Sequence, residues 1–137
     1  MKTNIIIGRF QTPYLHAGHL HLIATALREG DKVVILLGTP KDITDKNKSK
    51  NPYTIHERMD TIEKIFPQVR IHVLYDIEND DDIWSENVDF YCNKYENPTL
   101  YHSRDSFKDY YSGKVPLKEI PEIPGLSATQ IRESLNM

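Results

Sequence analysis

Two short segments, one near each end of the chain, combine residue types that bind phosphate. The first is Gly8-Arg9-Phe10-Gln11 followed by His16-Ala17-Gly18-His19. An apolar run before Gly8 predicts a strand, and apolar spacing after Gly18 predicts a helix. Backbone amides at a helix start suit phosphate oxygens, histidines add donors, and an arginine can clamp the same anion. Gly18 would let a ligand approach the backbone closely.

The local pattern alone leaves other interpretations open. Gly18 can simply start a helix whose neighbouring histidines are surface residues. His16, His19 and His21 can also be read as metal ligands. The metal interpretation is less favoured, because no acidic or cysteine ligand lies nearby in the sequence.

The second segment is Ser127-Ala128-Thr129-Gln130-Ile131-Arg132. Ser127 and Gln130 form a capping box that opens a last short helix. Thr129 can turn its hydroxyl towards an anion, and Arg132, one turn on, can reach a terminal phosphate. Alone the segment says little, because a capped C-terminal helix with an exposed arginine is commonplace.

Strands and helices alternate along the chain. Fully apolar strands separated by helices predict an α/β fold: a Rossmann-like, doubly wound parallel sheet of about five strands with helices on both faces. We expect one domain over residues 1–137. The expected strands are 4–8, 33–37, 69–75, 99–101 and an edge strand at 117–123, and the expected helices are 18–29, 54–66, 83–95 and 127–135.

Composition excludes several classes of protein. The net charge of −3, from 17 basic and 20 acidic residues, gives no electrostatic footprint for a nucleic-acid partner. The single cysteine, Cys92, excludes an intrachain disulfide. The apolar run at the N-terminus is too short for a signal sequence or a membrane span, so we expect a cytoplasmic protein that does not bind membranes.

Taken together, the two end segments resemble the HxGH nucleotidyltransferase superfamily. The similarity is greatest to nicotinamide-nucleotide (NMN) adenylyltransferases of the archaeal type and to the adenylyltransferase half of bacterial adenylyltransferase–Nudix fusions. Three further segments support this placement: Gly8-Arg9-Phe10-Gln11, Lys50-Asn51-Pro52-Tyr53-Thr54 with Glu57-Arg58, and Asp76 followed by Trp84. The loop between Gly8 and His19 is two residues longer than the family's usual GRFQPxHxGH.

The resemblance implies the reaction NMN + ATP to NAD + pyrophosphate, by in-line attack of the NMN phosphate on the α-phosphorus of ATP. It implies that Arg9, His16, His19 and Arg132 hold the ATP phosphates, with His19 and Arg132 stabilising the leaving pyrophosphate. Mg²⁺ would accompany ATP, bound mainly by phosphate and water. The remaining nucleotide contacts that it implies are Gly8, Phe10, Gln11, Gly18, Lys50, Ser127 and Thr129.

Three further candidate residues each have two interpretations. Trp84 either stacks on the nicotinamide ring or packs its helix onto the sheet. Asp76 either accepts a hydrogen bond from the carboxamide or simply ends the third strand. Arg58 either binds phosphate or is an exposed helix residue paired with Glu57 or Asp60.

Other functions stay open at this point. The run Asp80-Asp81-Asp82 is a metal site or, more in keeping with its position, a helix start. The acceptor can be nicotinate mononucleotide, FMN or phosphopantetheine, CTP can replace ATP, or the chain can be a nucleotide-binding module without catalysis. Relatives are often oligomers, so a homo-oligomer also stays open here.

Overall fold

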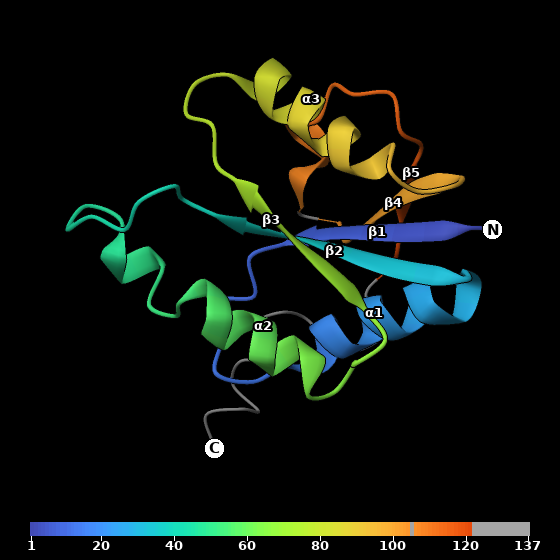
Figure 1. The fold of residues 1–137 in the computed structure, drawn as a ribbon, viewed down its shortest axis with the longest axis horizontal. Helices are drawn as coiled ribbons and strands as arrows, with labels where there is room; N and C mark the ends of the chain where they lie inside the picture. Colours follow the sequence, from blue (N-terminus) through green and yellow to red (C-terminus); the bar gives the residue numbers. More distant parts are fainter. Residues whose placement is uncertain (105, 122–137) are drawn as a thin grey trace.

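A five-stranded, all-parallel sheet forms the centre of the molecule (Figure 1). The computed structural model describes residues 1–104 and 106–121. The strand order is β3-β2-β1-β4-β5. The strands are β1 (Thr3–Gly8), β2 (Lys32–Thr39), β3 (Arg70–Tyr75), β4 (Pro98–His102) and β5 (Leu117–Glu119), and the α-helices are α1 (Ala17–Glu29), α2 (Ile55–Glu63) and α3 (Asp81–Cys92).

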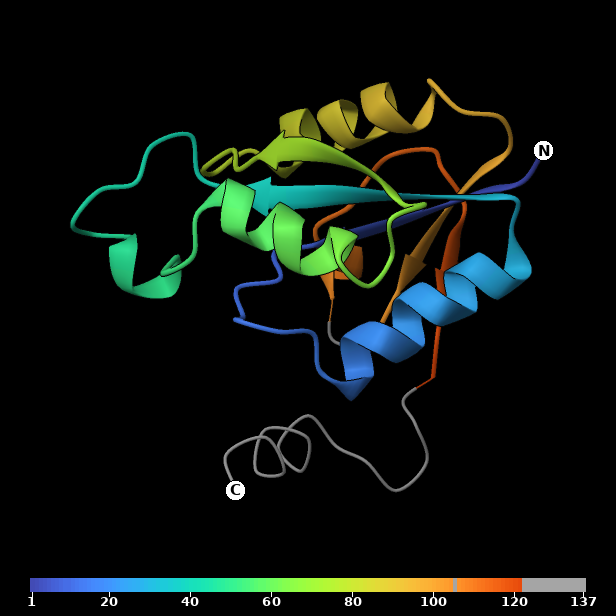
Figure 2. The ribbon, with the colours of Figure 1, turned by 60° about the horizontal axis from the view of Figure 1, so that its bottom comes forward.

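The two faces of the sheet are covered by different helices. Ile6 and Ile35 pack against Ile23 of α1 and Ile62 of α2, whereas Ile5 packs in a second cluster with residues of α3. Figure 2 shows α1 and α2 on one side of the sheet and α3 on the other. Burial on both faces explains why the central strands are apolar throughout. The predicted doubly wound fold is confirmed.

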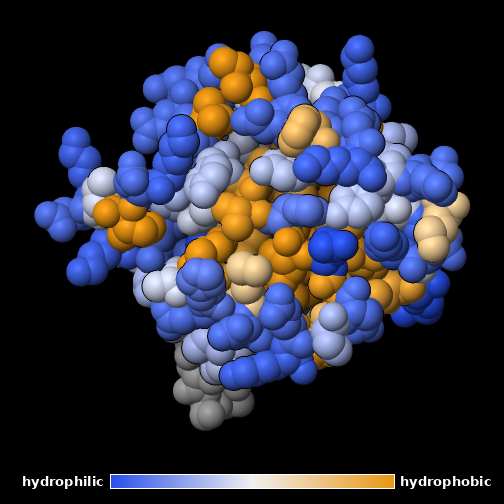
Figure 3. Space-filling model, viewed as in Figure 1, coloured by the Kyte–Doolittle hydropathy of each residue, from blue (hydrophilic) through white to orange (hydrophobic). Residues whose placement is uncertain are grey.

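Edge strands are less covered. In β3 all residues but Leu74 are half-buried or exposed. Figure 3 shows hydrophobic residues gathered in the middle of one face, where β3 crosses in front of β2, with hydrophilic residues around them. At the other edge, β5 ends at Glu119 and not at residue 123 as predicted, because Pro121 cannot donate to the sheet.

The helix starts follow from their capping residues. The predicted capping box of Thr54 and Glu57 is present at α2. At α3, Asp80 accepts a hydrogen bond from the amide of Ile83, so the acidic run is a helix start. Helix α1 begins one residue before Gly18, and its cap is His16.

Parallel strands bring their carboxyl ends to one edge of the sheet. Arg9 follows β1, the loop from Pro40 follows β2, and Asp76 follows β3. This edge is where ligands bind in open parallel sheets. Residues far apart in the sequence are therefore brought together at the place where the phosphate-binding segment was predicted.

Candidate active site

His16 and His19 cap the start of α1 together. The Nδ1 atom of His16 accepts hydrogen bonds from the amides of Gly18, at 3.1 Å, and His19, at 3.4 Å. The Nδ1 atom of His19 accepts one from the amide of His16, at 3.4 Å. The two rings are stacked with their centroids 3.6 Å apart. The longer loop therefore leaves both histidines side by side at the helix start.

This arrangement fixes the tautomer of both rings. A neutral imidazole whose Nδ1 accepts a hydrogen bond carries its proton on Nε2. Burial of His19, and next the like charge of His16, lower the pKa of His19 from 6.5 to about 4. His19 is thus neutral at pH 7 and has an Nε2–H donor. The Gly18 amide already donates to His16 in the helix cap. The imidazole N–H of His19 is a donor that an anion bound here can use.

Phe10 and Gly8 shape the turn after β1. Phe10 has a φ of 52°, its side chain is buried, and its ring centroid lies 4.8 Å from that of His19. A Cβ atom at Gly8 would lie 2.7 Å from Cε2 of Phe10. Gly8 is therefore needed for packing of the Phe10 ring, and Phe10 packs against a predicted phosphate-binding histidine. Direct contact of either residue with a nucleotide stays a prediction.

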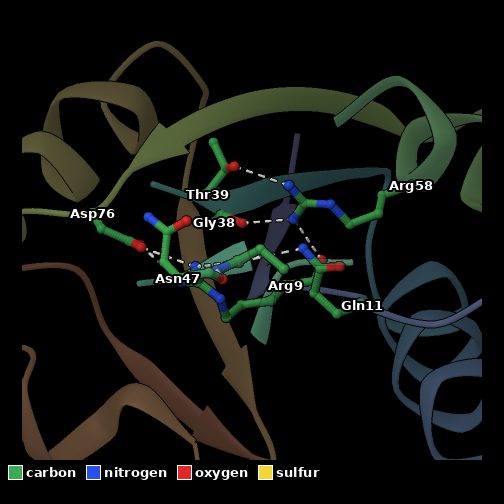
Figure 4. A network of polar contacts seen from close by, with 8 residues as sticks. Arg9, Gln11, Gly38, Thr39, Asn47, Arg58 and Asp76 are labelled. Atoms are coloured by element: carbon green, nitrogen blue, oxygen red, sulfur yellow. Dashed lines mark hydrogen bonds and ion pairs between the residues drawn. The ribbon is translucent and has the colours of Figure 1, made fainter. Parts of the chain in front are cut away.

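The Arg9 guanidinium lies at the centre of the site (Figure 4). Its Nη1 and Nη2 atoms donate to the two carboxylate oxygens of Asp76, at 2.8 and 2.9 Å, and Nη2 also donates to Oδ1 of Asn51, at 3.1 Å. Such a bidentate pair fixes the plane of the guanidinium. Asp76 therefore does more than end the third strand: it orients the arginine that we predicted to hold phosphate.

Gln11 and Asn51 tie the turn after β1 to the loop after β2. Gln11 accepts a hydrogen bond from the amide of Tyr53 at 3.0 Å and donates to Asn51. Asn51 in turn donates to the carbonyl of Asn47 at 2.9 Å. Sequence analysis assigned no role to the buried Asn51 side chain, since an isolated asparagine in a polar segment gives no signal of burial.

A wide cavity of about 640 Å³ opens between these two loops. Arg9 and Asp76 line it, and so do Lys41, Lys46 and Lys50. The structure thus brings the predicted Lys50 to the same cavity as Arg9. Asp42 and Glu78 line it as well, so four cationic and three acidic side chains leave the cavity with a slight excess of positive charge. A concave site with such an excess suits a polyphosphate.

Arg58 fits neither of the two interpretations given from the sequence, a phosphate contact or an exposed helix residue. Its side chain is 1% exposed, so it is neither a surface residue paired with Glu57 or Asp60 nor a group that reaches a ligand directly. The reason is its place on the inner face of α2, beneath the ends of β1 and β2, where backbone carbonyls supply acceptors. Burial lowers the pKa of Arg58.

A second cavity, of about 510 Å³, lies on the α3 side of Arg9. Arg9 and Asp76 line it too, together with Trp84, Phe107 and Tyr110. The ring centroids of Trp84 and Phe107 are 6.2 Å apart. Trp84 packs its helix against the sheet and also lines the cavity, so the two interpretations of this residue are compatible.

The sequence analysis missed Phe107 and Tyr110. They lie in a stretch rich in tyrosine, and that richness was the one available signal, but nothing in it indicated which rings face a cavity. Ser106, next to them, has a buried hydroxyl without a hydrogen-bond partner among the described residues.

The structure describes His21 but does not describe the predicted residues of the last segment. His21 lies 3.2 Å, through Nε2, from the carbonyl of Pro121, and within residues 1–104 and 106–121 no three His, Cys, Asp or Glu side chains are grouped as a metal site would need. None of the helices in these ranges is long and apolar enough to cross a membrane. The predicted Ser127, Thr129 and Arg132 lie outside the described residues.

Comparison with known proteins identifies the family. The cytidylyltransferase-like family model matches residues 5–134. The chain belongs to this family. It is 34% identical over 148 residues to a nicotinamide/nicotinic acid mononucleotide adenylyltransferase of Acinetobacter baylyi, and 28% identical over 138 residues to a nicotinamide-nucleotide adenylyltransferase of Thermoplasma volcanium. Each alignment covers 95% of this chain and 73% of the relative.

Solved structures agree on the fold. A bifunctional NMN adenylyltransferase/ADP ribose pyrophosphatase of Francisella tularensis superposes with a TM-score of 0.75 at 24% identity. The match covers 97% of this chain and 41% of that protein, so this chain spans less than half of its length. The predicted nucleotidyltransferase family and enzyme class are confirmed, and curated relatives are NMN adenylyltransferases, in agreement with the predicted function.

Proposed function

We propose that this chain transfers the adenylyl group of ATP to NMN, giving NAD and pyrophosphate. One observation carries the proposal: Arg9 and Asp76 line a cationic cavity on one side and an aromatic cavity on the other. The first suits a triphosphate and the second suits a planar ring. A group shared by both cavities lies where the phosphates of two nucleotides would meet. The names of the relatives at 28% and 34% identity support the same acceptor.

The chemistry requires positioning more than a nucleophile in the protein. An oxygen of the NMN phosphate forms the new bond to the α-phosphorus of ATP, and the bond from that phosphorus to the bridging oxygen breaks. The electron pair leaves with pyrophosphate, and no proton needs to move. Holding two anions in line, and donating hydrogen bonds to the leaving group, supplies the rate acceleration.

The residues divide between these tasks. Arg9, His16 and His19 contact the ATP phosphates, and the Nε2–H of His19 donates to the leaving pyrophosphate. Lys50 reaches the same phosphates from the loop that lines the larger cavity. Arg132, with Ser127 and Thr129, completes the phosphate site from the last segment, by resemblance to the family.

Mg²⁺ fits this site as a companion of ATP. Phosphate oxygens and water are the ligands it prefers, and the described residues group no three protein ligands that would form a cage. The metal would neutralise charge on the phosphates. We also propose one domain over residues 1–137, a cytoplasmic location and the capacity to form a homo-oligomer, each resting on the sequence and the family alone.

The test is a product assay with the purified protein. ATP and Mg²⁺ are supplied with NMN, nicotinate mononucleotide, FMN or phosphopantetheine in separate reactions, and products are identified by mass spectrometry. We expect NAD and pyrophosphate in equal amounts with NMN. CTP in place of ATP serves as the control for the nucleotide.

Two outcomes would contradict the proposal. If another acceptor turns over and NMN does not, the acceptor is wrong and the enzyme class stands. If ATP binds and none of the acceptors yields pyrophosphate, the chain is a nucleotide-binding module without catalysis.

A further inference from the structure

Arg58 spans three chain segments that meet under the active site (Figure 4). Its Nη1 atom donates to the carbonyl of Arg9 at 2.8 Å and to the carbonyl of Gly38 at 2.7 Å. Its Nη2 atom donates to Oγ1 of Thr39 at 2.9 Å, and Nε donates to the carbonyl of Thr54 at 3.3 Å. The ends of β1 and β2 are thereby fastened to the start of α2 by one side chain.

The guanidinium is held by carbonyl dipoles and hydroxyl oxygen, not by a carboxylate. None of the ion pairs within the described residues includes Arg58. Burying a charged side chain without a carboxylate partner costs stability. The arginine at this position therefore needs an explanation other than an ion pair. A planar group with five donors can reach all four acceptors at once, which no other side chain can do.

Arg58 fixes the backbone of Arg9, the arginine of the candidate active site. The carbonyl of Arg9 immediately precedes Phe10, whose φ of 52° is one that side chains rarely adopt. The hydrogen bond from Arg58 to this carbonyl holds the peptide in the orientation that this turn requires. Asp76 and Asn51 then fix the other end of Arg9, its guanidinium.

We infer that Arg58 is a positioning residue for adenylyl transfer, acting through Arg9 on the phosphates of ATP. The inference rests on the proposed role of Arg9 in the proposed function. Arg58 does not touch substrate. It sets where the Arg9 side chain begins, and a displacement there of about 1 Å can lower the rate about a hundredfold.

The variant that tests this is Arg58→Lys, which keeps the charge and can donate from one nitrogen only. We expect kcat/KM for ATP to fall about thirtyfold, mainly through a raised KM for ATP, with KM for NMN changed less than about twofold. A merely structural role would reduce the amount of active enzyme, which lowers kcat and leaves KM for ATP unchanged. That second pattern would overturn the inference.

A double-mutant cycle makes the test specific. In an Arg9→Ala background, Arg58→Lys should change kcat/KM for ATP by less than about twofold, because the side chain through which it acts is gone. An undiminished effect there would show that Arg58 acts independently of Arg9. Arg70→Lys, at the exposed opposite end of the sheet, is the matched control and should behave as the wild type.

Direct binding of ATP separates this inference from the proposed function. If the wild type forms no NAD, the function fails. The Kd of Mg-ATP, measured by calorimetry, then still tests Arg58: it should rise about tenfold in Arg58→Lys, and an unchanged Kd in folded protein would refute the inference. Thermal unfolding of each variant shows whether it is folded.

Discussion

The two sides of Arg9 are built in different ways. Towards α1 and α2, the side chains of Asn51 and Arg58 are held by hydrogen bonds, and the two histidines cap a helix together. Towards α3, the wall is made of the rings of Trp84, Phe107 and Tyr110. The polar side chains on the first side are oriented by hydrogen bonds, and the rings on the second side are oriented by packing.

This difference matches what each side would bind. Phosphates need donors at fixed positions, and a donor that is already oriented loses little free energy when charge develops in front of it. A planar ring needs a flat apolar surface, which tolerates small shifts. Substitutions on the α1–α2 side should therefore have larger effects on kcat/KM for ATP, and substitutions on the α3 side should act mainly on binding of the acceptor.

The largest effect is expected from His19→Asn. The asparagine carbonyl can take over the hydrogen bond that Nδ1 accepts from the His16 amide, so the helix cap is kept and the Nε2–H donor is lost. Loss of one such donor should lower kcat by about a hundredfold to a thousandfold. Steady-state rates of NAD formation measure the effect.

His56→Asn is the matched control, because His56 is exposed on α2. Thermal unfolding should show both variants folded. A kcat within threefold of the wild type for His19→Asn would remove this histidine from the mechanism and weaken the contrast between the two sides.

The same histidine should make stability depend on pH. An unfolded histidine takes up a proton near pH 6.5, whereas native His19 does so only near pH 4. The unfolded chain therefore binds more protons between these values, and stability falls as the pH drops through this window. The loss approaches about 3 kcal/mol at pH 4 and is absent above pH 7.

Urea unfolding at pH 7 and pH 4.5 measures this term. His19→Asn should lose less free energy of unfolding than the wild type between the two pH values, by roughly 2 kcal/mol. His56→Asn again serves as the control and should follow the wild type. Identical losses in the wild type and His19→Asn would show that His19 is not buried as a neutral ring.

The elements of the fold were predictable because each has a local signal. The sequence predicts β1 and β2 from their apolar runs, and it predicts the start of α2 from the Thr54–Glu57 capping box. The structure contains all three features. The limits of prediction lie at the ends of elements. Pro121 stops β5 sooner than predicted, and the histidine cap starts α1 one residue sooner.

The candidate site was predictable only where a motif marks it. Arg9, His19 and Lys50 have such a motif, and the structure brings Arg9 and Lys50 to one cavity. Arg58 was misjudged because an arginine beside a glutamate on a helix is usually exposed, and its burial depends on carbonyls supplied by distant strands. Phe107 was missed for the same reason: which rings face a cavity is a property of tertiary packing.

On the aromatic side, Trp84→Leu should raise KM for NMN about tenfold. Leucine keeps an apolar group in the second core cluster and removes the flat ring. KM for ATP should change less than twofold, since Trp84 lines the aromatic cavity and not the cationic one. Phe90→Leu, on the exposed part of the same helix, is the control. Equal changes in both KM values would mean that the two sides are not separate sites.

The smallest effect concerns the choice between NMN and nicotinate mononucleotide. Asp76 and Asp81, with Arg9, line a shallow pocket of about 270 Å³ beside Trp84. Two carboxylates against one guanidinium leave this pocket with an excess of negative charge, which should disfavour the nicotinate carboxylate and tolerate the uncharged carboxamide. Asp81→Asn should therefore lower the ratio of kcat/KM for NMN to that for nicotinate mononucleotide about threefold, a size suited to an exposed charge.

Glu86→Gln makes the same change of net charge on α3 at an exposed position that does not line this pocket. If it alters the ratio as much as Asp81→Asn, the preference comes from the overall charge of the protein and not from the pocket. Added salt distinguishes the two cases further. Screening weakens a long-range effect more than a short one, so the Asp81 effect should persist at 0.3 M salt, where the Debye length is about 6 Å. A specific effect of this kind would show that the α3 side, although built by packing, still selects its ligand by charge.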